Sequence, residues 1–241
     1  MDVGRAFKFM FDDPRWPLKL LIGGFFAVGF GSLQFLLPDE LAFVGQIISL
    51  LGGLVLTGYT LLLIRRVADG DDFPLPEWND IGGYFRSGLK AFVVQLGWSV
   101  PLILVAFLAG LAAFFGAATG GGRGLVLFGG LIFLVAVAAV VIVAPAGLGR
   151  LAVTGSIREG LNFRFILGMV RGNLGDYLLL FALFIAVGLI ALLGFLVFVV
   201  GALFTVPYAY LVVAHLTGQA YFRSTSTLPV VAATGRPYLE P

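Results

Sequence analysis

PLPEWNDIGGYFRSGLKAF, residues 74–92, is the stretch that decides the fold of this chain. Its two prolines hold the backbone extended, and after them the apolar residues take on helical spacing. A long apolar run follows directly, from about Ala91 to Phe115. A polar segment that leads through an amphipathic one into a run of this length is typical of an integral membrane protein.

The composition indicates the same class of protein. Of 241 residues, 60% are apolar and 12% are charged, about half the charged fraction of an ordinary soluble domain. The net charge is +2, but the basic residues are scattered between apolar runs, so we expect no nucleic-acid partner. The chain has no cysteine and one histidine, His215, which excludes a Cys/His metal site. We expect no metal or cofactor.

The apolar runs predict an all-α fold, a polytopic transmembrane bundle with six spans. A spanning helix needs about 20 apolar residues, and the runs lie at about 18–37, 41–64, 91–115, 125–149, 177–198 and 201–222. We expect them to pair as three hairpins in one transmembrane domain, residues 1–222. The main hydrophilic loop is 67–80, and the last turn is placed near Val199–Ala202. Residues 223–241 are expected to form a disordered cytoplasmic tail.

The basic residues predict the orientation, because loops rich in Lys and Arg stay in the cytoplasm. With six spans and a cytoplasmic start, every Lys and Arg except Arg123 lies on the cytoplasmic side. No A-x-A-like cleavage site follows the first apolar run, so it is expected to be retained as a span. We therefore predict a multi-pass protein of the cell membrane with both termini in the cytoplasm.

Each hairpin is preceded by an amphipathic segment, predicted to lie as a helix in the membrane interface. In the second segment Arg86 and Lys90 lie opposite the apolar face, as candidate contacts for anionic headgroups. The third segment is Ile157–Val170. The apolar faces predicted for the first two segments are Val3, Phe7, Met10 and Phe11, then Ile81, Tyr84, Phe85, Leu89 and Phe92. Ordinary juxtamembrane flanks are the alternative, and a common origin of the three units stays open.

The PLPEW segment, residues 74–78, contributes three further candidate functional residues, and Asp80 just after it is a fourth. Pro74 and Pro76 exclude helix, so the chain stays extended there. Trp78 is then expected at headgroup depth, where an amphipathic ring is favoured. Asp80 is a candidate N-cap for the helix that follows.

This element carries a resemblance to a known family. The pattern P-L-P-E-W-x-D-x-x-x-x-F-x-x-G-L-K-A, here Pro74 to Ala91, resembles the domain of unknown function 4013 family of prokaryotic integral membrane proteins. The resemblance implies a membrane location. It implies no activity and no catalytic or ligand residues.

Few residues of the predicted spans could carry chemistry. No span has a charged residue in its middle, and Lys19 lies at a span end, from which it can snorkel. His215 in the last span is either a proton-linked switch or ligand contact, or a histidine hydrogen-bonded to a neighbouring helix, which we favour. The acidic residues of the loop are either a site for a hard cation or a solvated turn, which we favour. These acidic residues are Asp69, Asp71, Asp72, Glu77 and Asp80.

Our first hypothesis is a non-enzymatic membrane scaffold or accessory subunit. Its amphipathic segments would contact the bilayer, anionic lipid headgroups, a membrane-protein partner or a second copy of the chain. The alternative is a small-solute transporter or channel with an uncharged pathway. That alternative predicts a polar-lined cavity faced by Gln34, Gln46, Gln95, Ser99 or Tyr208.

Overall fold

A computed structural model describes residues 1–32, 37–118, 122–196 and 198–226, so most of the predicted tail lies outside it. Every regular element among these residues is helical, which confirms the all-α class. The elements are α1 (Val3–Lys8), η1 (Phe9–Asp12), α2 (Trp16–Gly24), η2 (Phe25–Gly29), η3 (Asp39–Leu41), α4 (Ala42–Asp69), α5 (Ile81–Ala118), α6 (Gly122–Thr154), α7 (Ile157–Gly160), α8 (Phe163–Gly172), α9 (Leu174–Phe195) and α10 (Phe198–Thr225).

Five helices, α4, α5, α6, α9 and α10, are long and apolar enough to cross a membrane, and they match the last five predicted spans. The first predicted span is helical over Trp16–Ser32, where α2 continues through the π-helical turn η2. This helix is shorter than the 18 residues that the other five exceed, and residues 33–36 lie outside the described part. A sixth span therefore stays a prediction.

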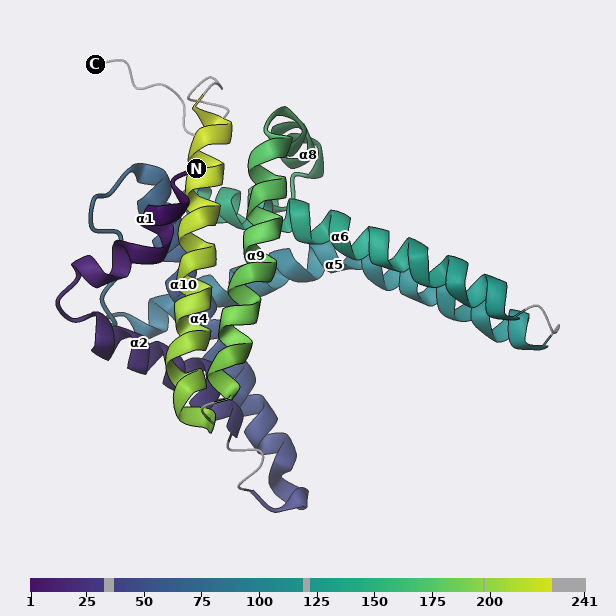
Figure 1. Cartoon of the computed structure of the whole chain (residues 1–241), viewed down its shortest axis with the longest axis horizontal. Coiled ribbons are helices and arrows are strands. Elements are labelled where there is room, and N and C mark those ends of the chain that lie inside the picture. Colours follow the sequence, from purple (N-terminus) through teal and green to yellow (C-terminus); the bar gives the residue numbers. More distant parts are fainter. Residues whose placement is uncertain (33–36, 119–121, 197, 227–241) are drawn as a thin grey trace.

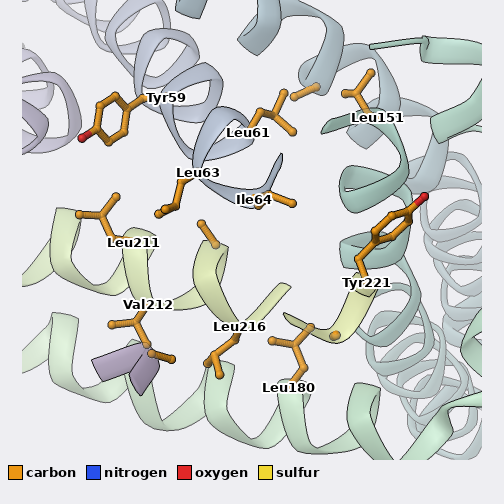
Figure 2. Packing of buried hydrophobic residues seen from close by; sticks show 14 of the residues in the cluster. Tyr59, Leu61, Leu63, Ile64, Leu151, Leu180, Leu211, Val212, Leu216 and Tyr221 are labelled. Atoms are coloured by element: carbon orange, nitrogen blue, oxygen red, sulfur yellow. The ribbon is translucent and has the colours of Figure 1, made fainter. Parts of the chain in front are cut away.

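The core lies where α4 and α10 pack together with α9 (Figures 1 and 2). Figure 2 shows Leu63 of α4, Leu180 of α9 and Leu216 of α10 within one buried cluster. Helices α5 and α6 pack along each other and extend away from this core as an arm (Figure 1). Phe107 and Leu131 are among the large apolar side chains exposed on the arm, as expected of a surface that faces lipid.

Helices α4 and α5 cross with their backbones in close contact at two glycines. A Cβ atom added to Gly58 would lie 1.7 Å from the carbonyl oxygen of Tyr84, and one added to Gly88 would lie 1.8 Å from that of Leu54. Small residues allow such an approach in membrane helices, where dispersion contacts drive association. Gly88 therefore has a packing role within the family-like element.

The N-terminus packs against the C-terminal part of α10. The backbone N–H of Asp2 donates to Gln219 Oε1 at 2.6 Å, and Gln219 Nε2 donates to the carbonyl oxygen of Asp2 at 3.0 Å. The two ends of the described chain thus lie at the same end of the fold (Figure 1). The leaflet that this end faces stays a prediction.

The first two amphipathic segments differ from the prediction. Residues 81–92 form the first turns of the continuous 38-residue helix α5, and no proline interrupts this stretch. Tyr84 is buried in the protein, whereas Ile81 and Leu89 are exposed, since the small residue Gly88 is the one that contacts α4. In the first segment α1 gives way to the 3₁₀ helix η1, which exposes Phe11 and buries neighbouring residues instead.

Two further boundaries also differ. The third segment is divided into α7 and α8, and the side-chain oxygen of Asn162 between them accepts from the N–H of Phe165 as the N-cap of α8. The turn predicted at Val199–Ala202 is wrong, because α9 ends at Phe195 and α10 begins at Phe198. No polar residue marks this turn, so hydropathy alone could not place it.

Candidate functional site

The PLPEW segment is packed into the protein. Pro74, Leu75 and Pro76 are buried. Their extended backbone leaves carbonyl groups without helical partners, and tyrosines of the two flanking helices bind them. Tyr59 of α4 donates its hydroxyl to the carbonyl oxygen of Pro76 at 2.8 Å, and Tyr84 of α5 donates to that of Glu77. The segment therefore ties α4 to α5.

Trp78 joins the same segment to α2. Its ring stacks on Tyr59, with centroids 4.0 Å apart and planes 6° apart, and also contacts Phe26 at 5.4 Å. Its indole N–H donates to the carbonyl oxygen of Lys19 at 3.1 Å. The ring is thus occupied by contacts within the protein, and its depth in a bilayer stays a prediction.

An ion-pair network lies beside this aromatic stack. Lys19 Nζ lies 2.5 Å from Asp13 Oδ2 and 2.7 Å from Glu77 Oε1, and Arg15 also binds Glu77 Oε1 at 2.6 Å. The Lys19 side chain is only 4% exposed, so the expectation that it snorkels is wrong. In lipid an unpaired ammonium is costly, and two carboxylates supplied by other segments remove that cost.

The pKa of Asp13 is governed by this arrangement. Burial alone would raise the pKa, but the hydrogen bond and charge of Lys19, together with Arg15, lower it below the ordinary value of 3.8. Asp13 therefore stays ionised and paired with Lys19 at neutral pH.

The other predicted residues of the element have separate positions. Asp80 accepts from the backbone N–H of Gly83 at 2.8 Å, the geometry of an N-cap for α5. Arg86 is exposed. Lys90 is exposed as well, and its Nζ donates to the carbonyl oxygen of Gly155 at 3.0 Å, just after α6 ends. Lys90 thus contacts the protein itself rather than solvent alone.

The carboxylates of the acidic loop do not form one cluster. Asp69 lies 3.6 Å from Arg65, Asp72 lies 4.0 Å from Arg5, and Glu77 belongs to the Lys19 network. Among the residues that the structure describes, no group of three or more His, Cys, Asp or Glu could hold a metal ion.

Sequence reasoning missed a second buried cation, Arg150 at the end of α6. Its guanidinium binds Glu159 Oε2 at 2.7 Å and lies 4.2 Å from the ring centroid of Phe165. Its side chain is 5% exposed. Lys19 and Arg150 are each buried with a carboxylate from another segment, Glu77 and Glu159, a role for which the local sequence holds no signal.

His215 is buried in the protein. Its ring stacks on Phe9 at 4.4 Å, and Nδ1 lies 3.0 Å from Gln219 Nε2. The hydrogen-bond partner lies on the same helix rather than on a neighbouring one. Through Gln219, which also binds Asp2, the histidine connects the N-terminal segment to α10.

The residues proposed to line a transport cavity are dispersed. Gln95 lies on the wall of an apolar cavity. Tyr208 instead donates its hydroxyl to the carbonyl oxygen of Phe7, and Ser99 donates to that of Gln95 in its own helix. Gln34 lies outside the described residues.

The fold defines an all-α protein with several helices able to span a membrane. Its two buried cations, Lys19 and Arg150, are paired with carboxylates near helix ends and loops. Residues 41–206 match the family described as "Protein of unknown function (DUF4013)", and the chain belongs to this family. The match includes the whole P-L-P-E-W element. Comparison with curated proteins and with solved structures gave no match.

Proposed function

We propose that this chain is a non-enzymatic membrane scaffold or accessory subunit that holds anionic lipid headgroups on the outer face of α7 and α8. The supporting observation is the two-sided character of α8. Ile166, Met169 and Val170 are buried against the protein, whereas Phe163 and Leu167 are exposed. Arginines lie on the same exposed side as these two apolar residues.

The exposed arginines of this region are Arg158, Arg164 and Arg171. None of them has a carboxylate within 4.0 Å among the described residues, unlike Arg150 and Lys19. Apolar side chains that enter the acyl region, next to cations at headgroup level, are the composition of a helix in the membrane interface. Phosphate is the anion that arginine binds best there.

The proposal places this face, together with both termini, at the cytoplasmic leaflet of the cell membrane. Support comes from the distribution of basic residues between the apolar helices. The transporter alternative has less support, because two residues expected to face its pathway bind backbone carbonyl groups instead: Tyr208 donates to Phe7 and Ser99 donates to Gln95.

Native mass spectrometry of the full chain, released from bilayers of phosphatidylglycerol and phosphatidylcholine, tests the proposal. The variant carries Arg158→Gln, Arg164→Gln and Arg171→Gln. Each arginine near an anionic surface contributes about 1 kcal/mol, so the ratio of bound phosphatidylglycerol to phosphatidylcholine should fall by roughly tenfold or more.

A charge-matched control replaces three arginines that already have carboxylate partners, Arg5, Arg65 and Arg223, again by Gln. Their side chains are about half exposed, so the control removes equal charge from comparable surface. The control should keep the lipid ratio of the unaltered chain. Equal losses in both triple variants would show that net charge, and not the α7–α8 face, selects the lipid.

A further inference from the structure

A cavity of about 450 Å³ lies between α4, α6, α9 and α10, with one residue of α5 on its wall. Its size is within the range of small-ligand sites. Most of the wall is apolar, as at Leu61, Pro145 and Phe184. The cavity is partly open at the protein surface, between helices that could face lipid. A ligand could therefore enter sideways from the bilayer.

The described wall carries no charged residue. A charged group placed there would lose its hydration without gaining a counter-ion, which costs several kcal/mol. The occupant is therefore uncharged where it contacts this wall.

The polar groups of the wall differ in whether they have partners. Thr57, Thr60 and Thr217 each donate to a carbonyl oxygen of their own helix at 2.8 Å. The side chains of Gln95 and Tyr210 form no hydrogen bond with any described residue. Both residues are exposed, and in a bilayer, where water is scarce, a ligand oxygen that bonds to them would be favoured.

A second cavity, of about 340 Å³, shares Thr57, Gln95 and Tyr210 with the first. Its wall includes Gly53 and Phe92 and, like the first, no charged residue in the described part of the chain. The Gln95 amide and the Tyr210 hydroxyl thus line both cavities. This arrangement matches a molecule with long apolar chains and a neutral oxygen-bearing group.

We propose that the two cavities bind an uncharged lipid, with its hydroxyl or ester oxygen hydrogen-bonded to Gln95 and Tyr210 and its chain in the cavity between α4 and α9. The site is separate from the α7–α8 face and does not depend on the function proposed above. The amide of Gln95 can donate and accept, and the hydroxyl of Tyr210 can do the same, so each can bond to a hydroxyl or ester oxygen of the ligand.

Photolabelling tests the site in the full chain, reconstituted in phosphatidylcholine nanodiscs. The probe is a long-chain alcohol that carries a diazirine on its chain, and labelled peptides are mapped by mass spectrometry. Labelling should concentrate on the peptides that contain Phe184 and Leu61. Excess unlabelled alcohol should suppress this labelling but not that of Phe107, which lies on the exposed arm. Labelling that no competitor reduces would overturn the proposal without any substitution in the protein.

A matched pair of substitutions in α9 tests where the apolar chain of the ligand lies. A Cβ atom at Gly188 or at Gly175 would meet no atom within 4 Å, but only Gly188 lines the cavity. Gly188→Leu should fill the cavity and remove most of the competable labelling, whereas Gly175→Leu should leave it unchanged. Equal labelling of the two variants contradicts the assignment.

Probes with different head groups test whether Gln95 and Tyr210 bind the ligand. Gln95→Leu or Tyr210→Phe should reduce labelling by the alcohol about fivefold, the effect of one lost hydrogen bond, and leave labelling by a diazirine alkane unchanged. A sulfonate of the same chain length should label the cavity more weakly than the alcohol. Equal labelling by sulfonate and alcohol would refute an uncharged ligand.

Discussion

Gly88→Ala tests the crossing of α4 and α5 that holds the PLPEW segment in place. The added Cβ atom would lie 1.8 Å from the carbonyl oxygen of Leu54, and ordinary contact begins at 3.4 Å, so the gap must open by 1.6 Å. The helix backbone fixes the position of the Cβ atom, and the carbonyl oxygen is part of the backbone, so neither atom can rotate away. The helices must separate instead.

The expected loss of stability follows from three contributions. Overpacking of this kind costs about 1–3 kcal/mol, and separation of the helices weakens the hydrogen bond from Tyr59 to Pro76, by about 1 kcal/mol. The gain in helix propensity from Gly to Ala offsets up to about 1 kcal/mol. We therefore expect a net destabilisation of about 1–3 kcal/mol.

The measurement is unfolding of the purified chain in mixed micelles with a rising fraction of sodium dodecyl sulfate, followed by circular dichroism. Gly110→Ala is the control in the same helix, because a Cβ atom there meets nothing within 4 Å. The control should be neutral or slightly stabilising. On α4, Gly58→Ala and Gly53→Ala form a second pair with the same expected contrast. Identical unfolding midpoints for Gly88→Ala and Gly110→Ala would refute the close crossing.

Three further predictions concern the Lys19 network and the aromatic stack. Lys19→Met leaves the mostly buried Asp13 without its partner, and we expect the free energy of unfolding to fall by about 2–3 kcal/mol in the same assay. The exposed control Lys8→Met should lower it by no more than about 0.5 kcal/mol. Because the pKa of folded Asp13 is lowered, its contribution to stability is present above pH 3.8 and is lost as the pH falls below that value. The midpoint of thermal unfolding should therefore fall between about pH 4 and 2, and Asp13→Asn should reduce this slope; an unchanged slope would contradict the pairing. Trp78→Phe keeps a ring stacked on Tyr59 but loses the indole hydrogen bond to the carbonyl oxygen of Lys19, so we expect a loss of about 1 kcal/mol by the same unfolding assay. Trp78→Ala loses both contacts and should cost about 3–5 kcal/mol, and equal losses in the two variants would contradict the stacking.

The amino-acid sequence by itself determined the class of protein. Apolar runs of spanning length require helices, since every backbone polar group must be paired in lipid, and this constraint acts within each segment. For the same reason the last five predicted spans correspond to helices of the structure. Asp80 at the start of α5 could also be predicted, because an N-cap acts on its own first turn.

The tertiary structure alone decided which faces are buried and where the buried charges lie. In lipid, large apolar side chains gain little from contact with protein, so the contact face of α5 is marked by Gly88 and not by Ile81 or Leu89. Lys19 is buried because Glu77, 58 residues away, reaches it, and Arg150 is buried because α7 supplies Glu159. Hydropathy is a local property, whereas the pairing of a charge depends on segments that only the folded chain brings together.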